Sequence, residues 1–124
     1  MDARLNSIIQ QGSQTFEYSM PIVAAGALAW LHMEDIFPQG RMFLPFDSIE
    51  VVNNSAQSIT LYIGSIADPY TIPAYMIKPI ARRSFYQVGI RNNGAADTVA
   101  GDILIHAKRL RPDVQAVISE RLTR

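Results

Sequence analysis

Runs in which apolar and polar residues alternate occur throughout the middle of the chain. This period of two is typical of half-buried β-strands. The clearest runs cover residues 14–20, 48–53, 58–63, 84–91 and 102–108. Shorter strands are expected at 70–72 and 76–80. Pro79 indicates a sheet edge or a bulge in the second of these, because proline cannot donate to a strand ladder.

Residues 22–36 allow two interpretations. Their Ala and Leu content favours a helix, whereas Gly26 and the alternation in LAWLHMEDI (28–36) favour strands on both sides of a turn. We expect two strands, followed by a loop at 37–41, where FPQGR contains a proline and a glycine. The chain then has about eight short strands separated by turn residues. That spacing predicts an all-β fold, an antiparallel β-sandwich of the jelly-roll type.

Two Asn-Asn pairs end predicted strands, in IEVVNNSAQSITLYIG (49–64) and in VGIRNNGAADTVAGDILIHA (88–107). Asparagine tolerates the left-handed backbone region and bonds its own backbone, so both pairs predict turns, which we interpret as hairpins. A further echo is YSMP at 18–21 against YTIP at 70–73. Together these echoes indicate a weak internal duplication, with each half forming one sheet or with strands interleaved between the sheets. Chance similarity between β-segments explains them equally well.

The alternation also predicts the core. Several predicted strands carry aliphatic residues on one face, and these should fill the space between the sheets. They are Ile49, Val51, Leu61, Ile63, Val88, Ile90, Ile103 and Ile105.

The two ends of the chain have a different pattern, with apolar residues at helical spacing. We therefore divide the chain into an N-terminal arm or short helix (1–13), a β-sandwich domain (14–110) and a C-terminal amphipathic segment (111–124). The apolar faces of the end segments need another surface to cover them, such as a neighbouring copy. The residues expected at an assembly interface are Leu5, Ile8, Ile9, Arg82, Arg83, Arg109, Arg111, Val114, Val117, Ile118 and Leu122.

Formal net charge is zero over the 124 residues, but the two signs are unevenly distributed. Residues 1–68 hold seven acidic and two basic side chains, whereas residues 69–124 hold nine basic and four acidic ones. A basic half is compatible with nucleic acid, yet a DNA-binding domain usually has a basic excess overall. We expect the two halves to pair within one chain or between copies. The most apolar stretch, MPIVAAGALAWLHM (20–33), is too short to cross a membrane.

No motif for catalysis or cofactor binding is recognisable. The chain has no cysteine, so thiol chemistry and Cys-ligated metals are excluded. A metal site at His32 or His106 would need a carboxylate such as Glu34 or Asp102 nearby, and ordinary core or surface positions explain both histidines better. Aromatic residues between 62 and 86 could stack on sugars or bases, although cross-strand packing is the simpler interpretation. We expect no enzyme, no cofactor and no metal.

The pattern I-x-V-x-N-x-S…I-T-L-Y-I, then a Pro-marked extended segment, then V-x-I-R-N-N-G-A…A-G-D-I-L-I resembles small β-sandwich virion proteins of tailed phages and related viruses. These proteins decorate or cement a capsid, or serve as minor capsid or tail components. The resemblance covers residues 14–109 and depends on turn placement, without a signature residue. It implies no active site, so no functional residue carries over.

We therefore expect a non-enzymatic structural protein of the virion, assembled as a homo-oligomer on a viral capsid or tail. Its partners would be further copies and the major capsid or other virion proteins, joined by interface burial and strand addition. Trp30 and Met33 are expected in the core or at a contact between copies. The alternative is a lectin-like or receptor-binding β-sandwich that recognises a ligand on a host surface. That alternative predicts an aromatic and polar cluster at loop tips, whereas assembly predicts exposed apolar residues.

Overall fold

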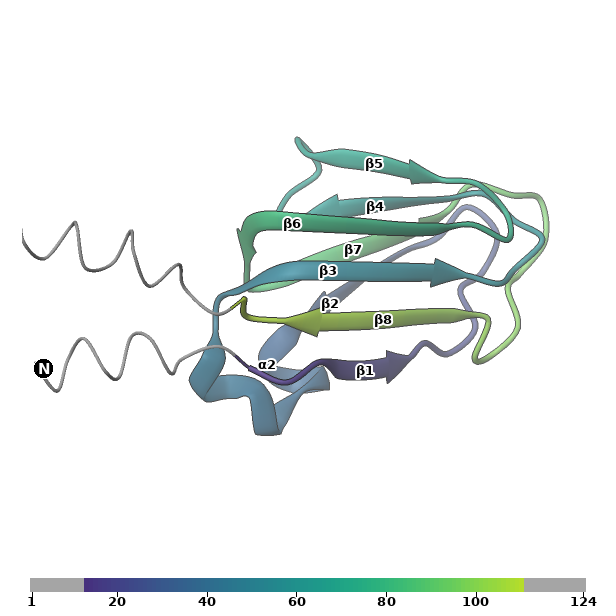
Figure 1. Ribbon diagram of the computed structural model, residues 1–124. Helices are drawn as coiled ribbons and strands as arrows, with labels where there is room; N and C mark the ends of the chain where they lie inside the picture. Colours follow the sequence, from purple (N-terminus) through teal and green to yellow (C-terminus); the bar gives the residue numbers. More distant parts are fainter. Residues whose placement is uncertain (1–12, 111–124) are drawn as a thin grey trace, which may run out of the picture.

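A computed structural model describes residues 13–110, which form eight strands and two short helical segments (Figure 1). In chain order these are β1 (Phe16–Ser19), β2 (Leu28–His32), helix α2 (Met33–Ile36), the 3-10 helix η1 (Pro38–Phe43), β3 (Phe46–Asn53), β4 (Ile59–Ile63), β5 (Pro69–Ile72), β6 (Ile77–Phe85), β7 (Gln87–Asn92) and β8 (Ile103–Lys108).

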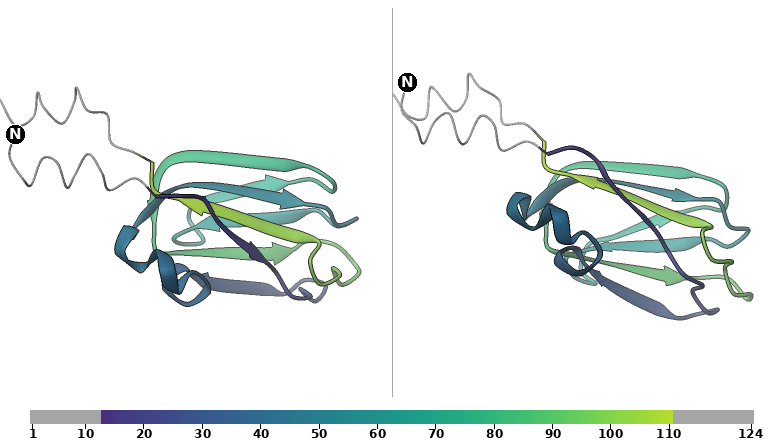
Figure 2. Two further views of the ribbon diagram at one scale, coloured as in Figure 1. Left: turned by 60° about the horizontal axis from the view of Figure 1, so that its bottom comes forward. Right: turned by 90° about the horizontal axis from the view of Figure 1, so that it is seen from below.

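The strands form two four-stranded antiparallel sheets, which Figure 2 shows as two layers. Sheet A has the order β1-β8-β3-β6 and sheet B has the order β2-β7-β4-β5. Apart from β4 and β5, strands that follow one another in the chain belong to different sheets. The partners β1 with β8, β2 with β7, β3 with β6 and β4 with β5 make one long antiparallel ribbon rolled over itself. This is the strand order of a jelly roll, and it confirms the predicted fold class.

The core between the sheets is the predicted one. All eight aliphatic residues expected there are at most 5% exposed. Alternation makes this possible, because each strand turns one set of side chains toward the facing sheet. Phe46, which is fully buried, adds an aromatic cluster with Phe16, Phe37 and Phe85 at the end of the sandwich near η1.

The region 22–36 contains one strand and one helical turn. β2 confirms the strand over Leu28–His32, but Met33–Ile36 is helical, so Glu34 and Asp35 do not lie on a strand as the alternation had indicated. The Phe37 N–H donates to the Met33 carbonyl at 2.9 Å, and both side chains are buried, so core packing fixes the turn. The loop expected at 37–41 is also more regular, because η1 covers it.

Two prolines lie at sheet borders. β6 is a border strand of sheet A and contains Pro79, which confirms the edge expected there. β5 is a border strand of sheet B and begins with Pro69. The pairing of β3 with β6 also shifts register between Phe46 and Ser48, which face Phe85 and Ala81. The two additional residues on β6 form a bulge.

The Asn-Asn segments are turns, but they are not hairpins. The first leads from β3 in sheet A to β4 in sheet B, and the second leads from β7 in sheet B to β8 in sheet A. Neither joins two strands that pair with each other. Of the arrangements considered for an internal duplication, interleaved strands fit this order.

The described ends of the chain lie together at the end of the sandwich that also holds α2 and η1 (Figure 1). The Ser13 N–H donates to the Arg109 carbonyl at 2.9 Å, and the Arg109 N–H donates to Ser13 Oγ at 2.8 Å. The Leu110 N–H donates to Asp47 Oδ1 at 2.7 Å. The arm or helix expected at 1–13 and the segment at 111–124 fall outside the described residues, apart from Ser13.

Candidate functional site

Of the residues predicted at the assembly interface, three arginines lie in the described part of the chain. Arg82 and Arg83 lie in β6, whereas Arg109 follows β8, so β3 separates them in sheet A. The remaining interface residues lie outside residues 13–110: Leu5, Ile8, Ile9, Arg111, Val114, Val117, Ile118 and Leu122.

Arg83 has a partner within its own chain. Its guanidinium forms an ion pair with Asp68 and approaches the Tyr70 hydroxyl at 3.4 Å. Asp68 belongs to the acidic half of the sequence, so this pair joins the two halves inside one molecule. Arg82, which is exposed, has a φ of 63°. A positive φ is unusual for a residue other than glycine and marks the β6 bulge, which turns the backbone away from a regular ladder.

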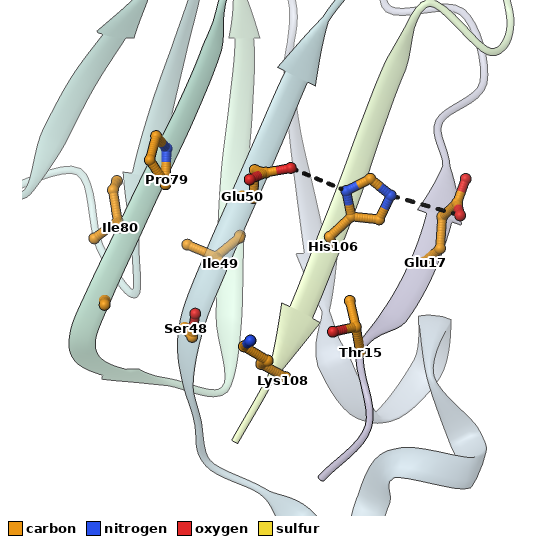
Figure 3. A pocket seen from close by; sticks show the side chains of 10 residues that line it. Thr15, Glu17, Ser48, Ile49, Glu50, Pro79, Ile80, His106 and Lys108 are labelled. Atoms are coloured by element: carbon orange, nitrogen blue, oxygen red, sulfur yellow. Dashed lines mark ion pairs between the residues drawn. The ribbon is translucent and has the colours of Figure 1, made fainter. Parts of the chain in front are cut away.

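A groove of about 600 Å³ lies over the outer face of sheet A (Figure 3). At its centre His106 lies between two carboxylates from neighbouring strands. His106 Nε2 is 3.5 Å from Glu17 Oε2, and His106 Nδ1 is 3.5 Å from Glu50 Oε1. The strand register produces this row, because Glu17 and Glu50 are the two cross-strand partners of His106.

The chemistry of the groove follows from its lining. A neutral imidazole has one N–H, whereas the imidazolium has two and can donate to both carboxylates at once. Lys108, Thr15 and Ser48 form the next row of side chains. Among the hydrogen bonds of residues 13–110, none joins a serine hydroxyl to His106, so the groove contains no Ser-His-Glu arrangement. The described residues also contain no group of three His, Cys, Asp or Glu placed to hold a metal ion.

The outer face of sheet B carries an aromatic row that the sequence did not place. Trp30 and Tyr62 are cross-strand neighbours of Gly89 on either side, and Tyr62 faces Pro69 on β5. The Trp30 ring covers Gly89, because a Cβ there would lie 3.1 Å from the ring. The ring centroids of Trp30 and Tyr62 are 6.3 Å apart. Of the two places expected for Met33 and Trp30, the core is confirmed for Met33, which is buried. Trp30 is 37% exposed and does not lie in the core, so a contact between copies stays the prediction for it.

A comparison with protein-family models gives no match, and comparisons with curated proteins and with solved structures give none either. Within the described part of the chain, no helix combines the length and the apolar character that crossing a membrane requires. What the structure defines is therefore a class: a small jelly roll with a groove on one outer face and an aromatic row on the other.

Proposed function

We propose that this chain is a structural protein of a virion, which assembles as a homo-oligomer on a capsid or tail and has no enzymatic activity. The observation that carries the proposal is the position of the described chain ends. Ser13 and Arg109 are hydrogen-bonded to each other, so both end segments leave the sandwich at one place. Such an arrangement suits a module attached through its ends, with the turns at the opposite end of the sandwich, from β3 to β4 and from β7 to β8, directed away from the attachment.

Exposed apolar side chains also support assembly. Contiguous apolar patches on a subunit mark interaction sites, whereas single apolar residues at a surface are ordinary. Tyr75, Met76 and Ile77 are consecutive in the chain, and all three are exposed large apolar side chains. The exposed ones in the described part of the chain are Ile22, Trp30, Met42, Ile66, Tyr75, Met76, Ile77, Tyr86 and Val99. The jelly roll is common in capsid proteins, although it also occurs in lectins, so topology alone does not choose between the two functions.

The proposal is tested on particles. An antiserum against the folded domain should label virus particles released from the source culture, and mass spectrometry should find the chain in them at many copies. A chain that ends at residue 110 should fold but lose its place on the particle. Particles that lack the chain, or that retain the shortened chain at the normal number of copies, would contradict the proposal.

A second candidate function is ligand recognition, and the aromatic row on sheet B favours it. One face of an indole ring over a flat sheet can stack on the C–H face of a sugar or on a base. The test is a glycan array, with Tyr62→Ala as the variant that removes part of the row. Specific glycan binding that this substitution abolishes would favour recognition over assembly.

A further inference from the structure

The two long borders of the sandwich differ in whether another strand can pair with them. One border is formed by β5 and β6, and the other by β1 and β2. A border strand presents unpaired N–H and C=O groups to any strand that approaches it, unless proline, charge or a bulge prevents this.

The border of β5 and β6 is blocked. The Ile63 N–H donates to the Asp68 carbonyl, and the Asn53 N–H donates to the Met76 carbonyl. Because bonding residues alternate along an antiparallel ladder, positions 69 and 79 point their backbone away from the sheet. Both positions are proline, so neither has an outward N–H. The β6 bulge at Arg82 blocks this border further.

The border strand β2 has none of these devices. Its sequence, LAWLH, contains no proline, no bulge and no Asp, Glu, Lys or Arg. The Asn92 N–H donates to the Ala27 carbonyl at 3.0 Å, and the Met33 N–H donates to the Tyr86 carbonyl at 2.9 Å. By the same alternation Ala29 and Leu31 bond to β7. The backbone N–H groups of Leu28, Trp30 and His32 then point outward, where the described residues place no further strand.

The free edge is complementary to itself. In an antiparallel pair of β2 strands centred on Trp30, the two Trp30 residues exchange N–H···O=C bonds, and the His32 N–H reaches the Leu28 carbonyl of the other copy. The pair places Trp30 beside Trp30, which is a favourable aromatic cross-strand contact, and opposes no like charges. The same operation on β1 would place Glu17 directly against Glu17, which is unfavourable.

We propose that two copies of this chain join along β2, antiparallel and about a two-fold axis at Trp30, so that sheet B continues from one subunit into the next. The partner is a second copy, because a two-fold interface needs one self-complementary patch and β2 provides it. This deepens the proposed homo-oligomer by naming its contact. It does not require that the assembly belong to a virion, so the two proposals can fail separately.

The most direct test is backbone hydrogen exchange of the full chain at high and low concentration. The amides of Leu28, Trp30 and His32 should exchange slowly in the concentrated sample and rapidly after dilution. Those of Ala29 and Leu31, which bond to β7, should stay protected in both. Fast exchange of the three outward amides at every concentration would overturn the proposal, and this measurement needs no variant.

Two further readouts sharpen the test. The chain has one tryptophan, so intrinsic fluorescence reports on Trp30 alone, and its emission should shift to longer wavelength on dilution. Sedimentation should give an even number of copies of the 13.8 kDa chain. An emission maximum independent of concentration, or a strictly monomeric chain, would contradict the proposal.

The variant that separates edge pairing from side-chain effects is His32→Pro. His32 has a φ of −91°, near the range that proline adopts, and its N–H points outward, so the fold should survive while the ring obstructs the other copy. His32→Pro should halve the mass in solution. His32→Ala, which keeps the N–H, and Thr71→Pro, which removes an outward N–H on β5, should leave the mass unchanged. An unchanged mass in a folded His32→Pro variant would refute the β2 contact, whereas unlabelled particles would refute only the virion role.

Discussion

The turn from β3 to β4 and the turn from β7 to β8 lie beside each other at one end of the sandwich, and each begins with a fully buried asparagine. The side-chain amide of Asn53 donates to the carbonyl four residues later, at Gln57, and that of Asn92 donates to the carbonyl of Ala96. Each side-chain oxygen accepts the N–H two residues later, from Ser55 in the first turn and from the matching residue in the second.

The contacts between segments match as well. The Asn53 amide reaches the Pro73 carbonyl in the loop from β5 to β6, and the Asn92 amide reaches the Val23 carbonyl in the loop from β1 to β2. These loops follow the echoed sequences YTIP and YSMP. If each strand of sheet A is replaced by the strand four positions away in the chain, so that β1 becomes β5, β8 becomes β4, β3 becomes β7 and β6 becomes β2, the order of sheet B results. The two halves are therefore equivalent in topology, and their buried asparagines share three corresponding bonds, as an interleaved internal duplication predicts.

The second asparagines complete the correspondence. The Asn54 N–H donates to the carbonyl of Asp102, just before β8, and the Asn93 N–H donates to the carbonyl of Ser58, just before β4. Each turn thus holds the start of the other half's last strand. The difference between first and second asparagines is burial, since Asn54 and Asn93 are exposed. Each Asn-Asn pair therefore has two roles: its first asparagine is a buried clamp, and its second is an exposed turn residue.

The largest expected effect tests the strands that the second turn joins. Ile90→Ala in β7 and Ile103→Ala in β8 should each lower the free energy of unfolding by about 2–5 kcal/mol, because a cavity forms between sheets that cannot collapse onto it. Both side chains are at most 1% exposed. Urea denaturation measures the effect, and an unchanged midpoint in both variants would mean that these faces do not form the core.

The next effect tests the clamps themselves. Asn53→Ala and Asn92→Ala should each cost about 1–3 kcal/mol, because buried carbonyl and N–H groups lose their partners. Asn53 should cost more, since it bonds three carbonyls as well as the N–H and hydroxyl of Ser55. Thermal unfolding of the pair measures the difference. Equal losses would show that the additional bonds of Asn53 contribute nothing to stability, and negligible losses in both variants would show that neither asparagine holds its turn.

The sequence predicts the features of this fold that depend on residues close together in the chain better than those that depend on residues far apart. Strand positions and the core follow from alternation within a few residues, so Ile90 and Ile103 were predictable. The path of the chain is not local. The pattern predicts hairpins at Asn53 and Asn92 because it does not say which strands pair. The Glu17–His106–Glu50 row depends on register between distant strands. The exposed position of Trp30 depends on which face of β2 meets the core.

A smaller effect concerns the contact between the turns. A Cβ on Gly94 would fall 1.7 Å from Gln57 Oε1, so Gly94→Ala requires Gln57 to move, while Gln57 is a flexible side chain that can do so. We expect a loss of about 1 kcal/mol. In the double variant with Gln57→Ala the loss should shrink, because the obstructing atoms are gone. A double-mutant cycle measures this coupling. Additive losses of stability would show that residues 94 and 57 do not interact sterically.

The smallest effects separate the two exposed asparagines. The Asn93 amide donates to Thr60 Oγ1 at 2.7 Å, whereas the described residues give the Asn54 side chain no hydrogen bond. Asn93→Ala should therefore cost about 0.5 kcal/mol, the value of an exposed neutral bond, and Asn54→Ala should change stability by less than about 0.5 kcal/mol. Their backbone N–H groups, which hold Ser58 and Asp102, are unaffected by either change. Chemical denaturation of both variants beside Asn53→Ala checks the order. If Asn54→Ala lost as much stability as Asn53→Ala, burial would not be what distinguishes the first asparagine of the pair from the second.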